Sequence, residues 1–98
     1  EQKIITVELI QEKTANAFGI RVDDLLSQRR SRDITVPRQI AMYLCREMTD
    51  VSLPKIGSKF GGRDHSTVIH AHKEIAKSIR TDPQISLMIT KIMEDLKK

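Results

Sequence analysis

SLPKIGSKFGGRDHSTVIHAHKEIAKSI, Ser52 to Ile79, is the stretch that decides the fold. It predicts two helices that meet at a sharp turn. Ser52 can cap the first helix with its hydroxyl, and Pro54 follows where a missing N–H costs nothing. Gly61-Gly62 ends this helix, because glycine reaches positive φ without a Cβ clash. The first half is therefore an amphipathic helix of about two turns, with an apolar face made by Leu53, Ile56 and Phe60.

The second helix of this stretch starts at Asp64, whose carboxylate can accept from first-turn amides. Its later apolar positions recur at helical spacing and predict one buried face, made by Val68, Ile69, His72, Ile75, Ala76 and Ile79. Its first turn is polar and holds His65, Ser66 and Thr67. A helix with a polar tip and anchored later turns can enter the major groove of DNA, and helix-turn-helix proteins read bases with this end. The stretch therefore predicts a helix-turn-helix DNA reader over residues 52–80.

Two helices are predicted before residue 28. Thr6 can cap the first, which ends at Gly19, and its apolar stripe is Val7, Ile10, Ala17 and Phe18 with Thr14 between. Residues 21–27 form a short second helix. Its Asp23-Asp24 pair suits the positive end of a helix dipole better than shared acid–base chemistry, because adjacent carboxylates point in different directions.

Two more helices flank the central stretch. The first has Pro37 near its start, with Arg38 and Gln39 in its first turn, where free amides could help to clamp a phosphate. Its stripe is Val36, Ile40, Ala41, Tyr43, Leu44 and Met48, and Cys45 is expected to be a buried, inert thiol. After Thr81-Asp82-Pro83 a last helix carries Ile85, Met88, Ile89, Ile92, Met93 and Leu96. Core packing is the simpler interpretation of this stripe, and a docking face of a helical protein-interaction module is the alternative.

Positive charge is concentrated in the middle of the chain. Residues 28–63 hold eight basic and three acidic residues, a net charge of +5, although the whole chain carries only +4. The connector QRRSRD, residues 28–33, has no apolar side chain, so its arginines lie on the surface. They can reach phosphates, and one could enter a narrow minor groove. This pattern favours a nucleic-acid binder, and an ordinary solvated basic surface remains the alternative.

Length and composition limit the possible fold classes. The 98 residues fit one all-α domain, over residues 1–98, with an aliphatic core, because the chain has two Phe, one Tyr and no Trp. The lone Cys45 permits no internal disulfide, which suits a reducing cytosol. No apolar run approaches about 18 residues, so no membrane span is predicted.

Neither a metal site nor catalysis is predicted. His65, His70 and His72 are not spaced four residues apart on a helix, so no pair has the geometry of a helical zinc site. His72 is expected in the core and His70 at the surface. The chain has no phosphate-binding loop of the P-loop type, no nucleophile elbow and no Cys–His signature. We therefore expect no enzyme activity and no cofactor.

GGRDHSTVIHA, Gly61 to Ala71, closely resembles the signature of the C-terminal DNA-binding domain of the DnaA family of bacterial chromosomal replication initiators. The likeness continues upstream through RRSRD, PRQIAMYL, REMTD and SLPKIG, and covers essentially the whole chain. Several strings in the right order are far more specific than one helix-turn-helix pattern. The resemblance implies a compact multi-helix domain with a Trp-repressor-like helix-turn-helix unit. It also implies binding to short asymmetric DNA sites, the DnaA boxes, at the replication origin and at regulated promoters.

The resemblance also implies which residues touch DNA. It assigns Arg30 to the minor groove, and to the bases of the major groove it assigns Asp64, His65, Ser66 and Thr67. The predicted backbone contacts are Arg29, Arg32, Arg38, Gln39, Ser52, Leu53, Pro54, Lys55, Lys59, Arg63, His70 and Lys73. Ser66 stands where the family more often has Thr. Asp64 has two predicted tasks, capping the helix and reading a base, so each carboxylate oxygen must take one.

The family's ATPase module is missing from this chain. By resemblance, ATP binding, oligomerisation on the origin and strand opening belong to that module. For this chain we expect a monomer that binds double-stranded DNA in the cytoplasm at the nucleoid, without a membrane span. Replication-regulator proteins are possible further partners that the resemblance implies.

Overall fold

The computed structural model describes residues 4–98 and is helical throughout its regular parts. Its helices, in chain order, are α1 (Val7–Phe18), α2 (Val22–Leu26), α3 (Arg32–Met48), α4 (Leu53–Ser58), α5 (His65–Thr81) and α6 (Pro83–Leu96). No strand occurs among the described residues. The predicted all-α fold with a helix-turn-helix unit is therefore confirmed.

Side-chain caps set the starts of four of these helices. The capping residues are Thr6 for α1, Ser52 for α4, Asp64 for α5 and Asp82 for α6. Each side-chain oxygen accepts a hydrogen bond from a first-turn amide, at distances of 3.0 to 3.4 Å. These bonds satisfy amides that have no partner within the helix. Local sequence chemistry therefore sets where these helices begin.

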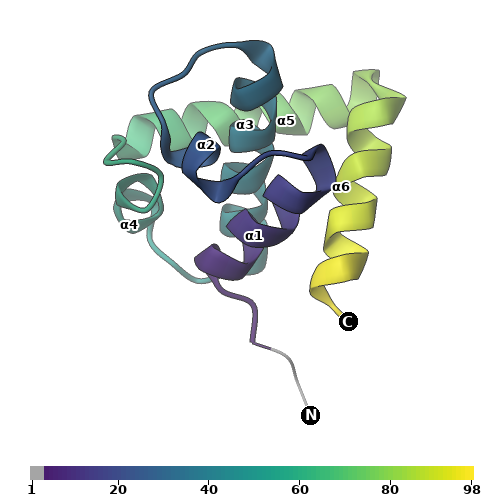
Figure 1. Ribbon diagram of the computed structural model, residues 1–98, viewed down its shortest axis with the longest axis horizontal. Helices are drawn as coiled ribbons and strands as arrows, with labels where there is room; N and C mark the ends of the chain where they lie inside the picture. Colours follow the sequence, from purple (N-terminus) through teal and green to yellow (C-terminus); the bar gives the residue numbers. More distant parts are fainter. Residues whose placement is uncertain (1–3) are drawn as a thin grey trace.

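Helix α3 lies at the centre of the molecule, with α1 in front of it and α5 crossing behind it in Figure 1. Helix α6 packs against α1 and α5, and α4 packs against α5 and α3. One cluster of buried side chains joins all six helices of the described chain. Its largest members are aliphatic apart from Phe60, as the composition predicts. The helix-turn-helix unit, α4 with α5, is thus built into the core.

The predicted start of α3 was wrong. The helix begins at Arg32 after the N-cap Ser31, so Pro37 lies inside it and Arg38 lies beyond its first turn. Ile34 explains the earlier start, because it is only 1% exposed and anchors the additional turn in the core. A proline this close to a helix start removes one hydrogen bond, a loss that a well-packed turn can offset.

Three predicted core positions were also placed differently. Ala15, and not Ala17, is the buried alanine of α1. Ile69 is 41% exposed, because the buried face of α5 is formed by Val68, Ala71 and Ile75. His72 lies at the edge of the core, where its Nε2 is 2.7 Å from Oε2 of Glu47.

The last helix packs as predicted. Ile89, Ile92 and Leu96 of α6 are buried against the rest of the core. This half of the predicted stripe is therefore committed to the fold, and the other half, Ile85, Met88 and Met93, is partly buried. Cys45 is buried as well, and burial raises the pKa of its thiol to about 12, so the nucleophilic thiolate is scarce at neutral pH.

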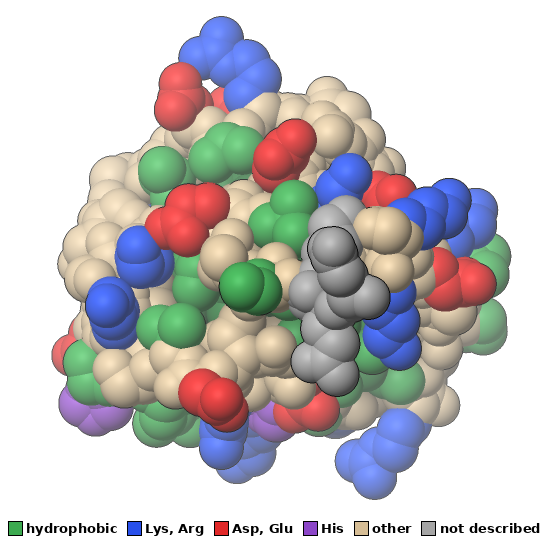
Figure 2. All heavy atoms as spheres, turned by 90° about the horizontal axis from the view of Figure 1, so that it is seen from below, with side chains coloured by type: hydrophobic (Ala, Val, Ile, Leu, Met, Phe, Trp, Pro, Cys, Tyr) green, Lys and Arg blue, Asp and Glu red, His purple; other side chains and the backbone are tan. Residues whose placement is uncertain are grey.

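Charge is mixed on the underside of the molecule. Figure 2 shows basic and acidic side chains alternating among apolar ones on this face, without a continuous patch of one sign. Within residues 4–98, no three His, Cys, Asp or Glu side chains gather closely enough to hold a metal ion. None of the helices described there has the length and apolar character that crossing a membrane would require.

Candidate nucleic-acid interface

The amino-terminal tip of α5 is fully presented to solvent. Its four exposed residues are Asp64, His65, Ser66 and Thr67. Val68 follows at once and is completely buried, and Ala71 and Ile75 are buried as well. The later turns therefore hold the helix against the core, and its polar tip projects from the surface. A helix is about 10–12 Å wide with its side chains, which matches the major groove of B-DNA.

Asp64 can cap α5 and still offer an oxygen to a ligand. Its Oδ1 accepts from the amide of Ser66 at 3.0 Å and lies 3.0 Å from Nδ1 of His65. The hydrogen bond from the Ser66 amide is the main cause of the lowered pKa of Asp64, so the carboxylate is ionised at neutral pH. Both of these contacts fall on Oδ1, and neither uses Oδ2. The two predicted tasks of Asp64 can therefore be divided between its oxygens.

Glycines allow α4, the turn and α5 to lie close together. Gly61 and Gly62 adopt φ values of +78° and +76°, as the sequence predicts for this turn. Gly57, inside α4, was not predicted to matter. A Cβ built there would lie 2.3 Å from the carbonyl oxygen of Arg63, so only glycine allows this approach. A glycine in the middle of a short amphipathic helix is the sequence signal that indicates such a contact.

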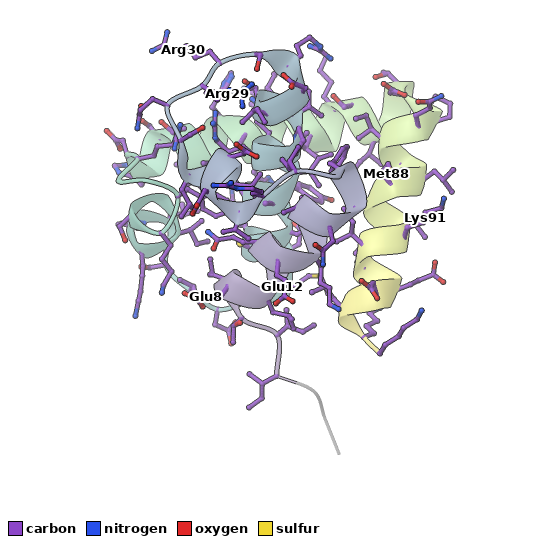
Figure 3. The ribbon with its side chains drawn as sticks, in the orientation of Figure 1. Glu8, Glu12, Arg29, Arg30, Met88 and Lys91 are labelled. Carbon is purple, nitrogen blue, oxygen red and sulfur yellow. The ribbon has the colours of Figure 1, made fainter. Side chains whose placement is uncertain are left out.

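The basic connector forms a loop between α2 and α3. Arg29, Arg30 and Arg32 are all exposed, and Figure 3 shows Arg30 pointing away from the body of the molecule. Arg29 is held more closely, because its amide donates to Oγ of Ser27 at 3.3 Å and its Nη1 lies 3.6 Å from Asp24. In Figure 1 this loop and the first turn of α5 lie toward the same side, away from the C-terminus.

Arg38 and Arg63 point inward and not into solvent. Arg38 is only 6% exposed, and its Nε and Nη2 donate to the carbonyl oxygens of Leu25 and Ser27, both at 2.9 Å. Arg63 is half-buried, and its guanidinium donates to the carbonyl oxygen of Phe60 and, at 2.7 Å, to that of Ser27. Burial lowers the pKa of both guanidinium groups, but arginine remains charged at neutral pH. Sequence patterns did not predict the bonds to Leu25 and Ser27, because these join residues 11 to 36 positions apart.

The other predicted backbone contacts come from α3, from α4 and its caps, and from α5. The exposed members are Ser52, Pro54, Lys55, His70 and Lys73, and the half-buried ones are Gln39, Leu53 and Lys59. Nζ of Lys59 already lies 2.6 Å from Oε2 of Glu8, and this hydrogen bond is the main cause of the lowered pKa of Glu8. Exposed ion pairs of this kind contribute little, so Lys59 can exchange Glu8 for a phosphate at small cost.

A basic stripe continues along α5 beyond the predicted residues. Lys77 and Arg80 follow Lys73 at helical spacing, and with Arg46 of α3 they line a shallow groove around the exposed Ile69. The spacing of four and seven residues after Lys73 is the signal that predicts this stripe.

One comparison with known proteins bears on this surface. A family model described as the bacterial DnaA protein helix-turn-helix matches residues 7–75. The match covers α1 to α4 and the first eleven residues of α5, and so includes the basic loop, the glycine turn and the exposed tip.

Proposed function

Because the chain belongs to the bacterial DnaA helix-turn-helix family, a family of DNA-binding replication initiators, we propose that it recognises short asymmetric duplex sites of the DnaA-box type. One observation carries this proposal: α5 presents a solvent-exposed polar tip from an anchored helix, on the same side as the exposed Arg29 and Arg30 of the loop and Arg32 at the start of α3. Bound at such sites, the domain would direct initiation of chromosome replication and regulate some promoters. The proposal places it in the cytoplasm, on the nucleoid.

The base-reading residues of the proposal are Asp64, His65, Ser66 and Thr67. Oδ2 of Asp64, which is not used by the cap, can accept a hydrogen bond from a cytosine amino group in the major groove. His65 and Thr67 can contact thymine, through its methyl group or its O4 acceptor. Ser66 keeps a hydroxyl but has no methyl group to pack on a thymine methyl. We therefore propose a box preference that is weaker at the base facing Ser66 than in family members with Thr.

The basic loop supplies the second half of the proposed interface. Arg30 is the proposed minor-groove residue, because it is exposed and points outward from the loop. Narrow minor grooves have a strong negative potential that favours an inserted arginine. Phosphate contacts from the surrounding polar and basic side chains would set the register of the duplex.

In this proposal the domain recognises the DNA site and carries out no catalytic step. ATP-dependent steps of initiation would belong to a separate ATPase module. The alternative function, protein docking through the α6 stripe, has only the partly buried Ile85, Met88 and Met93 to offer, because Ile89, Ile92 and Leu96 are buried in the core. We propose that the domain is monomeric, which light scattering without DNA can test.

Titration of the domain against a labelled DnaA-box duplex and a scrambled duplex tests the proposal. We expect tighter binding to the box at two salt concentrations. With about six phosphate contacts, the logarithm of affinity should fall with the logarithm of salt concentration at a slope near −5. Equal affinity for the two duplexes at both salt concentrations would refute sequence-specific recognition.

Replacing Asp64 by alanine should reduce the preference for the box. We expect a loss of roughly 1–3 kcal/mol in discrimination at one base pair, because one hydrogen bond to a base edge is removed. Asp64→Asn is the matched control for helix capping, since asparagine caps about as well as aspartate. It should keep the thermal stability of the domain while changing the preferred base. An unchanged box-to-scrambled ratio for Asp64→Ala would show that Asp64 does not read a base.

A further inference from the structure

The carbonyl oxygen of Ser27 receives two guanidinium groups from different parts of the chain. Nη2 of Arg38, from α3, donates to it at 2.9 Å, and Nη2 of Arg63, from the turn before α5, donates at 2.7 Å. Arg38 also donates to the carbonyl oxygen of Leu25, in the last turn of α2. Carbonyl groups at a helix end have no partner within the helix, so these arginines satisfy them. We define Arg38, Arg63 and Ser27 as the arginine clamp.

The arginine clamp is joined directly to the basic loop. The hydroxyl of Ser27 donates to the carbonyl oxygen of Asp24 at 2.7 Å and accepts from the amide of Arg29 at 3.3 Å. Arg30 is the next residue. The backbone of the outward-pointing Arg30 therefore directly follows a residue whose amide is hydrogen-bonded to Ser27.

Close packing of backbone supports the same connection. A Cβ built on Gly61 would lie 2.3 Å from the carbonyl oxygen of Leu26, so the turn before α5 touches the end of α2. Arg63, two residues further on, donates to the carbonyl oxygen of Phe60 in the same turn as well as to Ser27. Hydrogen bonds and close packing thus join two segments: the loop that carries Arg30 and the turn that leads into the tip of α5.

We propose that Arg38 and Arg63 are positioning residues, which hold the minor-groove arginine Arg30 in register with the recognition tip of α5. This inference rests on the proposed function, since it assumes that Arg30 and the α5 tip touch the same duplex. It gives these two arginines a different role from the phosphate contacts that the family resemblance implies. Nε and Nη2 of Arg38, and Nη1 and Nη2 of Arg63, donate to carbonyl oxygens of the protein, and Arg38 is only 6% exposed.

Arginine chemistry suits this role better than lysine chemistry would. A guanidinium is planar and offers several N–H groups in a fixed fork, so one side chain can span two carbonyl oxygens. A lysine ammonium has the same charge but forms a single point contact. No carboxylate pairs with Arg38 or Arg63 in residues 4–98, so both charges also raise the positive potential beneath the loop.

Lysine substitutions combined with removal of Arg30 test the proposal. Arg38→Lys and Arg63→Lys keep the charge, so non-specific affinity and the salt slope should stay near those of the original protein. The preference for a box duplex over a scrambled duplex should fall about tenfold, because Arg30 is no longer held in place. In the Arg30→Ala background, the same lysine substitutions should change box affinity less than about twofold.

Arg32→Ala is the matched comparison for a side chain that acts directly on a phosphate. It should weaken binding to both duplexes, reduce the salt slope by about one, and combine additively with Arg30→Ala. Circular dichroism melts would establish that each variant is folded at the assay temperature. If burial makes Arg38→Lys unfold, the half-buried Arg63→Lys decides the question.

Additive effects of Arg63→Lys and Arg30→Ala in folded protein would overturn the positioning role. So would a lysine variant with box preference equal to that of the original protein. A failure of the proposed function has a different signature, because the unsubstituted protein would then bind box and scrambled duplexes equally. The two outcomes are therefore distinguishable within one set of titrations.

Discussion

Gly61→Ala is expected to lower the free energy of unfolding by about 3 kcal/mol or more. Two costs add at this position. The φ of +78° belongs to the left-handed region, which disfavours a residue with a Cβ. The added Cβ would also lie 2.3 Å from the carbonyl oxygen of Leu26, so backbone must move. Thermal denaturation of the variant measures the loss, which corresponds to a melting temperature lower by more than about 12 °C.

Gly62→Ala separates these two costs. Gly62 has nearly the same φ, +76°, but no atom lies within 4 Å of a Cβ built there. Its substitution should cost only about 1–2 kcal/mol. The entropy that alanine removes from the unfolded chain is the same for both variants and cancels in the comparison. Equal losses for the two variants would contradict the close approach of the turn to α2.

Gly61→Ala should also weaken DNA recognition. Moving the turn away from Leu26 separates the tip of α5 from the loop that carries Arg30. We therefore expect Gly61→Ala to lose box preference at temperatures where it is still folded, and Gly62→Ala to retain most of it. Titration with box and scrambled duplexes measures both.

Phe60→Ala is expected to have the second large effect, a loss of about 3–5 kcal/mol in the free energy of unfolding. Phe60 is completely buried in the cluster that joins α4 and α5 to the other helices. Truncation removes apolar contacts and leaves a cavity that the surrounding helices can fill only in part. Urea denaturation followed by circular dichroism measures the change, with the midpoint expected to fall and the slope to stay constant.

The chain's second phenylalanine provides the control for this prediction. Phe18 lies at the end of α1 and is only partly buried. The same truncation should therefore cost clearly less there, because less apolar surface is lost and water can enter the space. A loss at Phe18 as large as that at Phe60 would contradict the deeper burial of Phe60 in the core.

Much of the candidate interface could be predicted from local patterns. Ser52 and Asp64 cap their helices as predicted, and Gly61-Gly62 form the turn between α4 and α5. These predictions succeed because capping and positive φ depend on residues that are close in sequence. The predicted start of α3 failed because one buried side chain, Ile34, extended the helix by more than a turn.

The amino-acid sequence alone determined the helical fold class, the polar tip of α5 and the basic loop, since each depends on spacing within a few turns of helix. Tertiary structure alone decided the hydrogen-bond partners of Arg38 and Arg63. A sequence shows two more arginines in a basic segment and predicts phosphate contacts. Folding brings both guanidinium groups to the carbonyl oxygen of Ser27, and their burial there gives them internal partners. The physical reason is that a long cationic side chain takes its hydrogen-bond partners from whatever backbone the packing of distant helices places within reach.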